Sequence, residues 1–157
     1  MESAKTEDLV TAYLALGTNL GDKEANILRV YELIEERIGT IVGRSSFYYS
    51  KPWGFTSEND FVNTVICVKC SMKPRILLEA TQEIERMMGR HKDKAVTSEA
   101  CDNANAAHRE YHDRIIDIDI LMYGDLSIDE PDLKIPHPLM KERDFVMVPL
   151  NELLQDK

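Results

Sequence analysis

The spacing of apolar residues divides the start of the chain into a strand, a turn and a helix. Residues 10–16 are mostly apolar and lead into the turn formers of residues 17–22, which predicts a strand followed by a turn. From Lys23 onward, apolar residues recur at spacings of three and four, the period of a helix. Asp22 is the candidate N-cap and Gly39 follows the last apolar position, so the first helix is expected between them.

Two strands and a second helix are predicted in the middle of the chain. Residues 41–49 are rich in β-branched and aromatic residues, residues 61–70 alternate, and a long polar loop joins them. Ser71 as N-cap and Pro74 in the first turn open a helix that Gly89 ends. The stripe of this helix that is expected to face the core consists of Leu77, Ala80, Thr81, Ile84, Met87 and Met88.

A last strand is predicted at residues 115–123, which completes the order strand, helix, strand, strand, helix, strand. This order is typical of a ferredoxin-like βαββαβ sandwich, an α+β fold whose mostly antiparallel sheet carries flanking helices. Residues 90–113 contain hardly any large aliphatic side chains and are expected to form a mobile loop. After Tyr123, four prolines are expected to break the chain into short pieces that wrap the sheet.

Length and composition indicate one ordinary globular domain over residues 1–157. A chain of this length buries about 68–70% of its unfolded surface, which is enough for a core. No apolar run approaches the roughly 18 residues that span a bilayer, so we expect no membrane partner. Residues 1–9 are acidic and polar, unlike a secretory signal, and we therefore expect the protein in the cytoplasm.

Charge and cysteine positions exclude two further classes. The formal net charge is −9, and nucleic acid is a poor candidate partner because binding to a phosphate backbone needs clustered Lys and Arg. Cys67 and Cys70 lie three apart in a predicted strand, so they point to opposite faces. Buried thiols in a reducing compartment are therefore preferred to a redox pair.

The most distinctive polar pattern is the pair Asp117 and Asp119, which share one face of the predicted strand. At about 5 Å and an effective dielectric near 20, their repulsion is on the order of 3 kcal/mol, which a pair of divalent cations would offset. Mg²⁺ takes one or two carboxylates together with substrate phosphate oxygens, so the pair suits a metal–nucleotide complex. Two surface acids on a half-exposed strand give the same pattern. The residues expected on the opposite, core-facing side are Ile116, Ile118, Ile120 and Met122.

Phosphate would have to be held by side chains in this protein. Residues 17–23 lack the spacing and the Lys-Ser/Thr ending of a Walker loop, and the sequence contains no G-x-G-x-x-G. Each basic candidate is also explained as an ordinary surface charge. The candidates are Arg90, Lys92, Arg114, His137 and Arg143.

Histidines suggest one weak and one stronger candidate site. His108 and His112 would share a helix face downstream of Cys101, but they lack the Glu of H-E-x-x-H, so loop residues are preferred to a zinc site. His137 lies between two prolines whose rings restrict the backbone to extended conformations and fix the direction of the imidazole. A positioned ligand and a surface histidine remain equally compatible with this pattern.

Aromatic residues gather in the middle of the chain. Phe47 or Tyr49, on a predicted strand, is expected in the core. Trp53 and Phe55 lie in a loop with Pro and Gly, where a site for a flat aromatic ligand is a second explanation.

Several motifs occur in a fixed order over residues 12–150. They are ALGTNLG at 15–21, SSFY at 45–48, KPWG at 51–54, FVN at 61–63, RIIDIDI at 114–120 and PHPLM at 136–140, followed by Arg143 and Phe145. Gln82, Glu85, Gly89 and Arg90 fall at matching helix positions. Together these motifs resemble the 6-hydroxymethyl-7,8-dihydropterin pyrophosphokinase family of folate synthesis.

The resemblance implies transfer of a diphosphoryl group from ATP to 6-hydroxymethyl-7,8-dihydropterin, giving AMP and the pterin diphosphate, by a monomer that uses two Mg²⁺ ions. The implied metal ligands are Asp117 and Asp119, and the implied catalytic residues are these two with Arg90 and Arg114. The implied pterin-binding residues are Ser50, Trp53, Phe61, Asn63 and Phe145, with Phe61 and Phe145 on either side of the ring. The implied ATP-binding residues are Gln82, Glu85, His137 and Arg143.

One region departs from the family pattern. Residues 110–114 read EYHDR where the family usually has Arg-Trp-Gly-Pro-Arg, so only Arg114 transfers directly. Tyr111 and Arg109 are candidate replacements for the missing Trp and Arg. Two alternatives stay open, namely another Mg²⁺-dependent transferase on this fold and a ferredoxin-like binding module without catalysis.

Overall fold

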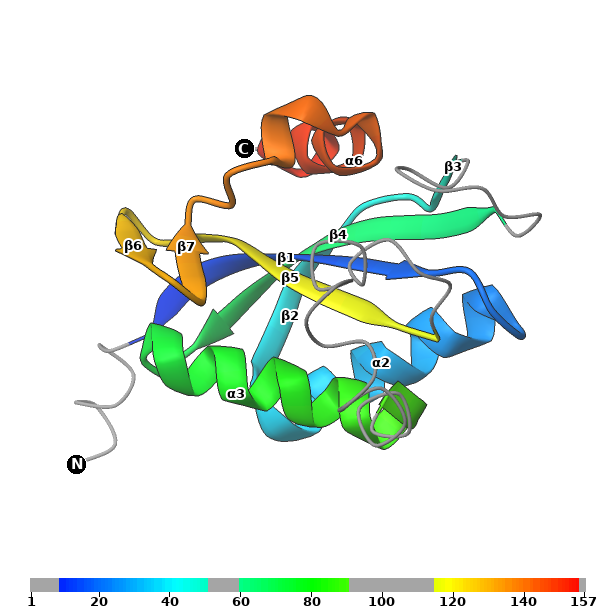
Figure 1. Cartoon of the computed structure of the whole chain (residues 1–157), viewed down its shortest axis with the longest axis horizontal. Helices are drawn as coiled ribbons and strands as arrows, with labels where there is room; N and C mark the ends of the chain where they lie inside the picture. Colours follow the sequence, from blue (N-terminus) through cyan, green and yellow to red (C-terminus); the bar gives the residue numbers. More distant parts are fainter. Residues whose placement is uncertain (1–8, 51–59, 91–114, 156–157) are drawn as a thin grey trace.

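The computed structural model in Figure 1 describes residues 9–50, 60–90 and 115–155. A mostly apolar sheet lies in the middle, with two helices on one face and one helix on the other (Figure 1). We call these the inner face and the outer face.

The sheet is antiparallel throughout its pairings. β1 (Val10–Thr18) lies at its centre between β4 (Phe61–Cys70) and β5 (Asp117–Tyr123), and both β2 (Gly39–Arg44) and β3 (Tyr48–Ser50) pair with β4. The strand order β2-β4-β1-β5 is that of the split βαβ arrangement. The predicted ferredoxin-like α+β fold is therefore confirmed.

The inner face is covered by α2 (Lys23–Arg37) and α3 (Pro74–Glu85). Asp22 caps α2 as predicted, because its side chain accepts the backbone N–H of Ala25 at 3.3 Å. The prediction of Ser71 as the N-cap of α3 was wrong. Lys73 occupies that position without a side-chain bond, since Pro74 at the first helical position already removes one unpaired N–H.

α3 continues into the turn η1 (Arg86–Arg90), which Gly89 ends as predicted. Gly89 has a φ of 117°, a conformation that a side chain would strain. Five of the six residues predicted for the buried stripe are buried or half-buried, but Met87 is exposed, because the helical period changes where η1 begins.

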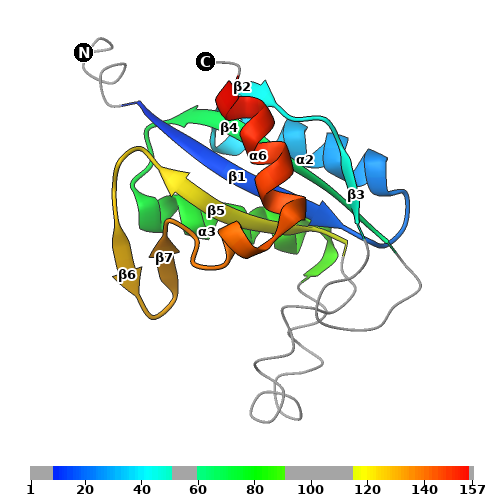
Figure 2. The ribbon, with the colours of Figure 1, turned by 90° about the horizontal axis from the view of Figure 1, so that it is seen from above.

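The outer face carries α6 (Asp144–Gln155), preceded by the turn η3 (Met140–Glu142). Figure 2 shows α6 crossing over the sheet. The expectation of short broken pieces was wrong here, because Pro149 lies inside this helix. An interior proline costs about 3 kcal/mol, whereas full burial of an aliphatic side chain contributes about 1.5–3 kcal/mol. The buried α6 residues that offset this cost are Val146, Leu150 and Leu153.

A small hairpin of β6 (Ile128–Glu130) and β7 (Leu133–Ile135) connects β5 to η3. Arg75 of α3 forms ion pairs with Glu130 and Asp132 on this hairpin. The hairpin is thereby fixed to the inner-face layer, and it determines where the segment after Ile135 returns to the sheet.

Two strands differ from their predicted form. The strand predicted at 41–49 is split between Arg44 and Tyr48. The Ser45 N–H still donates to the carbonyl of Val65 at 2.9 Å, but the N–H of Val65 donates to the Ser45 hydroxyl at 3.0 Å. In β5 the pairing with β1 shifts between Tyr13 and Leu14, so a bulge at Leu121 turns Met122 to the outer face and Tyr123 to the inner face. Met122 was therefore wrongly expected in the inner core.

The remaining early expectations have mixed outcomes. Cys67 and Cys70 belong to different core clusters on the two faces and are free thiols, as predicted. Phe47 packs against the core, whereas Tyr49 is 59% exposed. The expected mobile loop at 90–113 lies, apart from the backbone of Arg90, outside the described residues. In the described part of the chain, no helix is long and apolar enough to cross a membrane.

Candidate active site

The strand register aligns the predicted site residues on the outer face. Gly17 of β1 pairs with Asn63 on β4 and with Asp117 on β5, so these three residues form one row across the sheet. Two residues earlier in β1, Ala15 pairs with Asp119. Because directly paired residues point to the same face, Asn63 and both aspartates project toward the side that α6 covers.

The two aspartates are half-buried at the start of β5. Their Cα atoms are about 6.6 Å apart at 3.3 Å per residue, and both side chains leave the strand in the same direction. The sequence prediction of a shared face is therefore confirmed. The core side of the strand end is also as predicted, since Ile116, Ile118 and Ile120 belong to the inner core cluster.

Glu85 supports the backbone between the two aspartates. From the end of α3, its Oε2 accepts the N–H of Ile118 at 2.8 Å. β5 is an edge strand of the sheet, and no other strand in the described part of the chain pairs with it on the side away from β1. The carboxylate thus fixes the main chain at the position that sets the directions of Asp117 and Asp119.

Arg143 lies close to the aspartates from the start of α6. Its side chain is buried, with the residue 7% exposed, and its Nη1 is 4.0 Å from Oδ2 of Asp119. The guanidinium also lies 5.7 Å from the centre of the Phe145 ring, within the range of a cation–π contact. One buried cation therefore links an acidic and an aromatic member of the predicted site.

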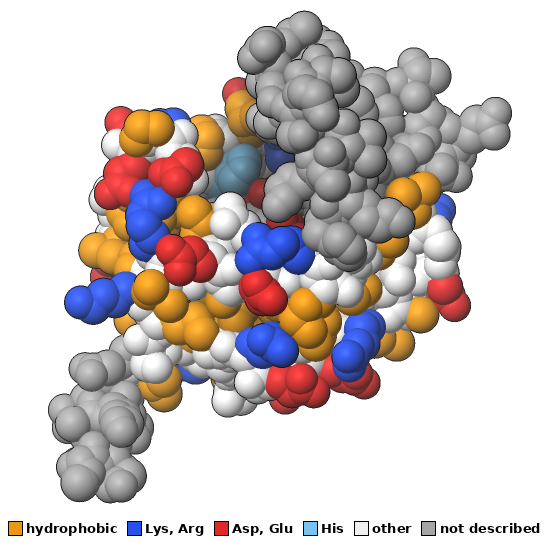
Figure 3. All heavy atoms as spheres, turned by 60° about the horizontal axis from the view of Figure 1, so that its bottom comes forward, with side chains coloured by type: hydrophobic (Ala, Val, Ile, Leu, Met, Phe, Trp, Pro, Cys, Tyr) orange, Lys and Arg blue, Asp and Glu red, His pale blue; other side chains and the backbone are white. Residues whose placement is uncertain are grey.

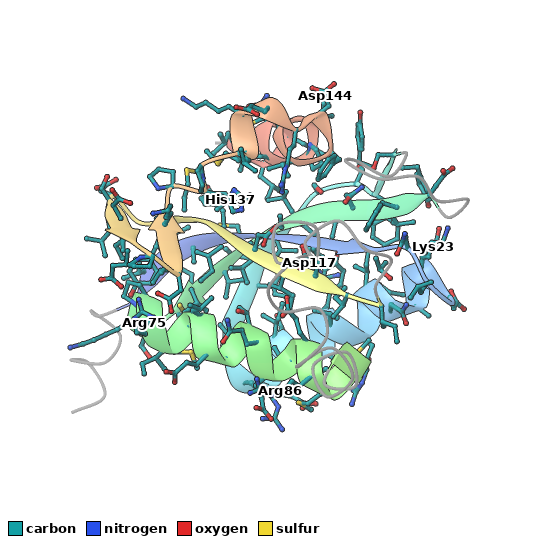
Figure 4. The ribbon with its side chains drawn as sticks, viewed as in Figure 1. Lys23, Arg75, Arg86, Asp117, His137 and Asp144 are labelled. Carbon is teal, nitrogen blue, oxygen red and sulfur yellow. The ribbon has the colours of Figure 1, made fainter. Side chains whose placement is uncertain are left out.

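His137 approaches β5 from the segment after β7. Its backbone N–H donates to the carbonyl of Leu121 at 3.0 Å, and its Nδ1 accepts the N–H of Leu139 at 3.2 Å. Figure 4 shows the imidazole on the α6 side of the sheet, in the same region as Asp117. Burial, with the charge of Arg143, lowers the pKa of His137 below its ordinary value, against the opposing effect of Asp117. The imidazole is therefore neutral near pH 7, with its proton on Nε2.

Asn63 is held in place at the other end of the row. It is 5% exposed, and its Nδ2 donates to Oγ of Ser50 at 2.9 Å and to the carbonyl of Tyr48 at 3.3 Å. A methyl group on Gly17 would lie only 3.0 Å from Oδ1 of Asn63 and 3.8 Å from a ring carbon of Phe61. The space above Gly17 is therefore bordered by two of the five residues predicted to bind the pterin, Asn63 and Phe61.

The other predicted residues differ in how far the structure places them. Phe61 and Phe145 are both half-buried, and they come from different layers, Phe61 from β4 in the sheet and Phe145 from α6. Gln82 is exposed on α3. Trp53, Lys92, Arg109, Tyr111 and Arg114 lie outside the described residues, as do His108 and His112, and so does the side chain of Arg90.

Sequence reasoning missed the part that Gly17 plays in this geometry. The motif at 15–21 includes it, but only the register shows that it separates Asn63 from Asp117. A glycine inside an otherwise apolar strand was the available signal, because such a position marks close approach of a neighbour.

The sequence model of the family described as 7,8-dihydro-6-hydroxymethylpterin-pyrophosphokinase matches residues 13–155. The chain belongs to this family. A 2-amino-4-hydroxy-6-hydroxymethyldihydropteridine pyrophosphokinase of Porphyromonas gingivalis is 38% identical over 146 residues, which cover 92% of this chain and 91% of that protein. The Aquifex aeolicus protein of the same name is 37% identical over 145 residues, covering 92% of this chain and 81% of that protein.

Solved structures agree on the fold of this pyrophosphokinase. The Plasmodium falciparum HPPK-DHPS A437G structure with SDX-DHP superposes with a TM-score of 0.68 at 18% identity. The match covers 92% of this chain but 42% of the Plasmodium chain, so the chain spans less than half of that protein. The family match and the named relatives confirm the predicted family and, with it, a pyrophosphokinase activity in folate biosynthesis. The alternative of an inactive binding module has no support.

Asp117 and Asp119 suit the few protein ligands that a magnesium–nucleotide complex needs. The described residues contain no group of three or more His, Cys, Asp or Glu side chains that could hold a metal ion. Two carboxylates on one face, with a buried arginine nearby, match the way Mg²⁺ uses few protein ligands and completes its shell with water and phosphate oxygens.

Over the face that carries α3, acidic and basic side chains are interspersed (Figure 3).

Proposed function

We propose that this pyrophosphokinase transfers the diphosphoryl group of Mg²⁺-bound ATP to the hydroxymethyl group of 6-hydroxymethyl-7,8-dihydropterin, giving AMP and the pterin diphosphate. The observation that carries the proposal is the row formed by Asn63, Gly17 and Asp117. It joins a buried amide, suited to the hydrogen-bonding edge of a pterin, to a carboxylate pair suited to the metal.

The length of this row supports the choice of substrate. Adjacent strands lie about 4.8 Å apart, so β4 and β5 are separated by about 9.6 Å across β1. That distance is comparable to the length of a bicyclic pterin with its hydroxymethyl substituent. With the amide edge at Asn63, the attacking hydroxyl would lie at the aspartates, and Gly17 leaves the floor between them flat.

The aromatic residues would hold the two faces of the pterin. Phe61 lies on the sheet and Phe145 on α6, so a flat ligand between the layers has a ring on each side. Each aromatic contact is worth about 0.5–1.5 kcal/mol beyond the burial of area. Arg143 over the Phe145 ring restrains that ring and adds positive charge close to the phosphates.

Asp117 and Asp119 are the proposed ligands of two Mg²⁺ ions, which supply charge neutralisation on the ATP phosphates when bound. The remaining work of the protein is positioning. Arg143 is suited to a bidentate contact with phosphate oxygens, and neutral His137 can donate one hydrogen bond from Nε2. Gln82, Glu85, Arg90 and Arg114 remain proposed ATP-site or catalytic residues.

We also propose a monomer that acts in the cytoplasm as one domain over residues 1–157. Free buried thiols at Cys67 and Cys70 support a reducing compartment. Sedimentation analysis would test the monomer directly.

A coupled assay of AMP release tests the function. With Mg²⁺ and ATP, we expect AMP only when the hydroxymethyl pterin is added, and the pterin product should gain the mass of a diphosphate. Formation of ADP instead of AMP, or release that does not depend on the pterin, would contradict the proposal. Replacing Mg²⁺ by excess chelator should stop the reaction and then allow full recovery when Mg²⁺ is restored.

A further inference from the structure

Both ends of α6 are attached to the sheet by polar contacts. Arg143, the residue directly before α6, has its Nη1 4.0 Å from Oδ2 of Asp119. Toward the last turn, the carboxylate of Glu152 accepts the backbone N–H of Ser46 at 3.1 and 3.2 Å and the Ser46 hydroxyl at 3.0 Å. We call this second attachment the Glu152–Ser46 clamp. It joins residues that are 106 positions apart in the sequence.

The Ser46 side of the clamp, in the connection between β2 and β3, is itself fixed to the sheet. Ser45, the residue before the clamp, donates its N–H to the carbonyl of Val65 at 2.9 Å. Its buried hydroxyl accepts the N–H of Val65 at 3.0 Å and lies 2.9 Å from Oγ1 of Thr64. Consecutive residues therefore bind to β4 and to α6, so the clamp ties α6 to a well-anchored part of the sheet.

On α6, Glu152 and Phe145 lie on the same side of the helix. Glu152 follows Phe145 by seven residues, which is close to two helical turns and about 10.5 Å along the axis. A rotation of α6 about its axis would move both side chains together. From Ser46 the chain leads directly into β3, where the Ser50 hydroxyl accepts a hydrogen bond from the amide of Asn63. The clamp thus connects the helix that carries one aromatic wall to the strand that supports the pterin-reading amide.

We infer that Glu152 is a positioning residue that sets the place of Phe145 relative to Asn63 and thereby the affinity for the pterin. The inference rests on the proposed function. Glu152 and Ser46 are both exposed, so the clamp contributes little to overall stability. Its effect is on the relative placement of two layers of the site.

Glu35 provides a matched control for Glu152. Like Glu152, it is an exposed helical glutamate that accepts a backbone N–H, in this case that of Ile41 in β2 at 3.0 Å, but it lies on α2 at the inner face. Glu152→Ala and Glu35→Ala therefore both remove a carboxylate that accepts a main-chain N–H, and only the first removes it from α6.

The experiment measures the Kd of the hydroxymethyl pterin and of Mg-ATP by calorimetry, together with KM, kcat and the thermal melt. We expect Glu152→Ala to raise the Kd and KM for the pterin at least fivefold, with the Kd of Mg-ATP within twofold of wild type. Glu35→Ala should leave both affinities unchanged. Equal pterin affinities in the two variants would overturn the inference, whether both are unchanged or both are weakened.

A double-mutant cycle checks that the effect passes through the clamp. Ser46→Ala removes only the hydroxyl donor and should raise the pterin Kd less than Glu152→Ala does. In the Glu152→Ala background it should then have no further effect, and an additive effect would overturn the inference. A wild-type protein that neither binds the pterin nor releases AMP would instead reject the proposed function. If the wild type is active but Glu152→Ala and Glu35→Ala have equal pterin affinities, only the inference about Glu152 is rejected.

Discussion

Replacing Gly17 by alanine should separate pterin binding from stability. The added methyl would lie 3.0 Å from Oδ1 of Asn63, closer than ordinary contact, so the amide must move by a few tenths of an ångström. The bond from Nδ2 of Asn63 to the Tyr48 carbonyl is already 3.3 Å long, and this movement would take it beyond hydrogen-bond distance.

The two effects on stability nearly cancel. Loss of that bond costs about 1 kcal/mol. The backbone of Gly17 has no positive φ, so alanine fits its conformation and contributes about 0.4–1 kcal/mol by restricting the unfolded chain. We therefore expect a melting temperature within a few degrees of wild type. Pterin binding has no such compensation, because the displaced amide weakens one or two contacts to the ligand, which corresponds to about a tenfold loss of affinity.

Gly43→Ala is the control for this prediction. Gly43 is also a strand glycine on the outer face, but a methyl there would meet Cys67 and Leu153 at ordinary contacts of 3.5 and 3.6 Å. Calorimetric titration of the pterin, beside a thermal melt, should show weakened binding for Gly17→Ala alone. Unchanged pterin affinity in Gly17→Ala would refute the placement of the substrate above this residue.

Three further predictions follow from the site. Asp117→Asn or Asp119→Asn should abolish AMP formation without lowering the melting temperature, since each relieves repulsion between carboxylates, and wild-type turnover in both variants would reject the two-metal role. Phe145→Ala should weaken pterin binding at least about tenfold with little change for Mg-ATP, whereas equal losses for both ligands with a large drop in melting temperature would indicate a core residue. Above the ordinary pKa of 6.5, His137 is neutral in both the folded and the unfolded protein. Below that pH the unfolded chain binds the proton first, because the pKa of His137 is lowered in the folded protein. The free energy of unfolding of the apo-protein should therefore fall with decreasing pH, by up to about 1.4 kcal/mol per pH unit. His137→Gln, measured by denaturant unfolding in chelator, should lose that part of the slope, and an unchanged slope would contradict the lowered pKa.

Local patterns were sufficient for the elements whose sequence and environment agree. The strand predicted at 61–70 has the bounds of β4, because it is buried along its length and ends at polar residues. The Asp117 and Asp119 pair was also readable, since side-chain direction in a strand depends only on the period of two.

Features that depend on distant partners were not readable from the sequence. The Leu121 bulge adds one residue to β5 without disturbing its apolar composition, so only pairing with β1 reveals it. α6 was missed because Pro149 opposes a helix locally and burial against the sheet overcomes it. The roles of Gly17 and Glu152 are set by register and by a contact across most of the chain.

Glu35 and Glu85, which accept backbone N–H groups of edge strands from the inner-face helices, also reduce the tendency of the sheet to aggregate. In the described part of the chain β2, β3 and β5 each have a strand partner on one side only, and such an edge strand offers unpaired N–H and C=O groups to any other extended chain. Glu35 occupies an N–H of β2, while Glu85 occupies one of β5 and His137 binds a carbonyl of the same strand. Each of these contacts places a side chain or a return segment where a foreign strand would have to dock. The residues that fix the backbone beside Asp117 and Asp119, the proposed metal ligands, therefore also oppose growth of the sheet into a β-aggregate.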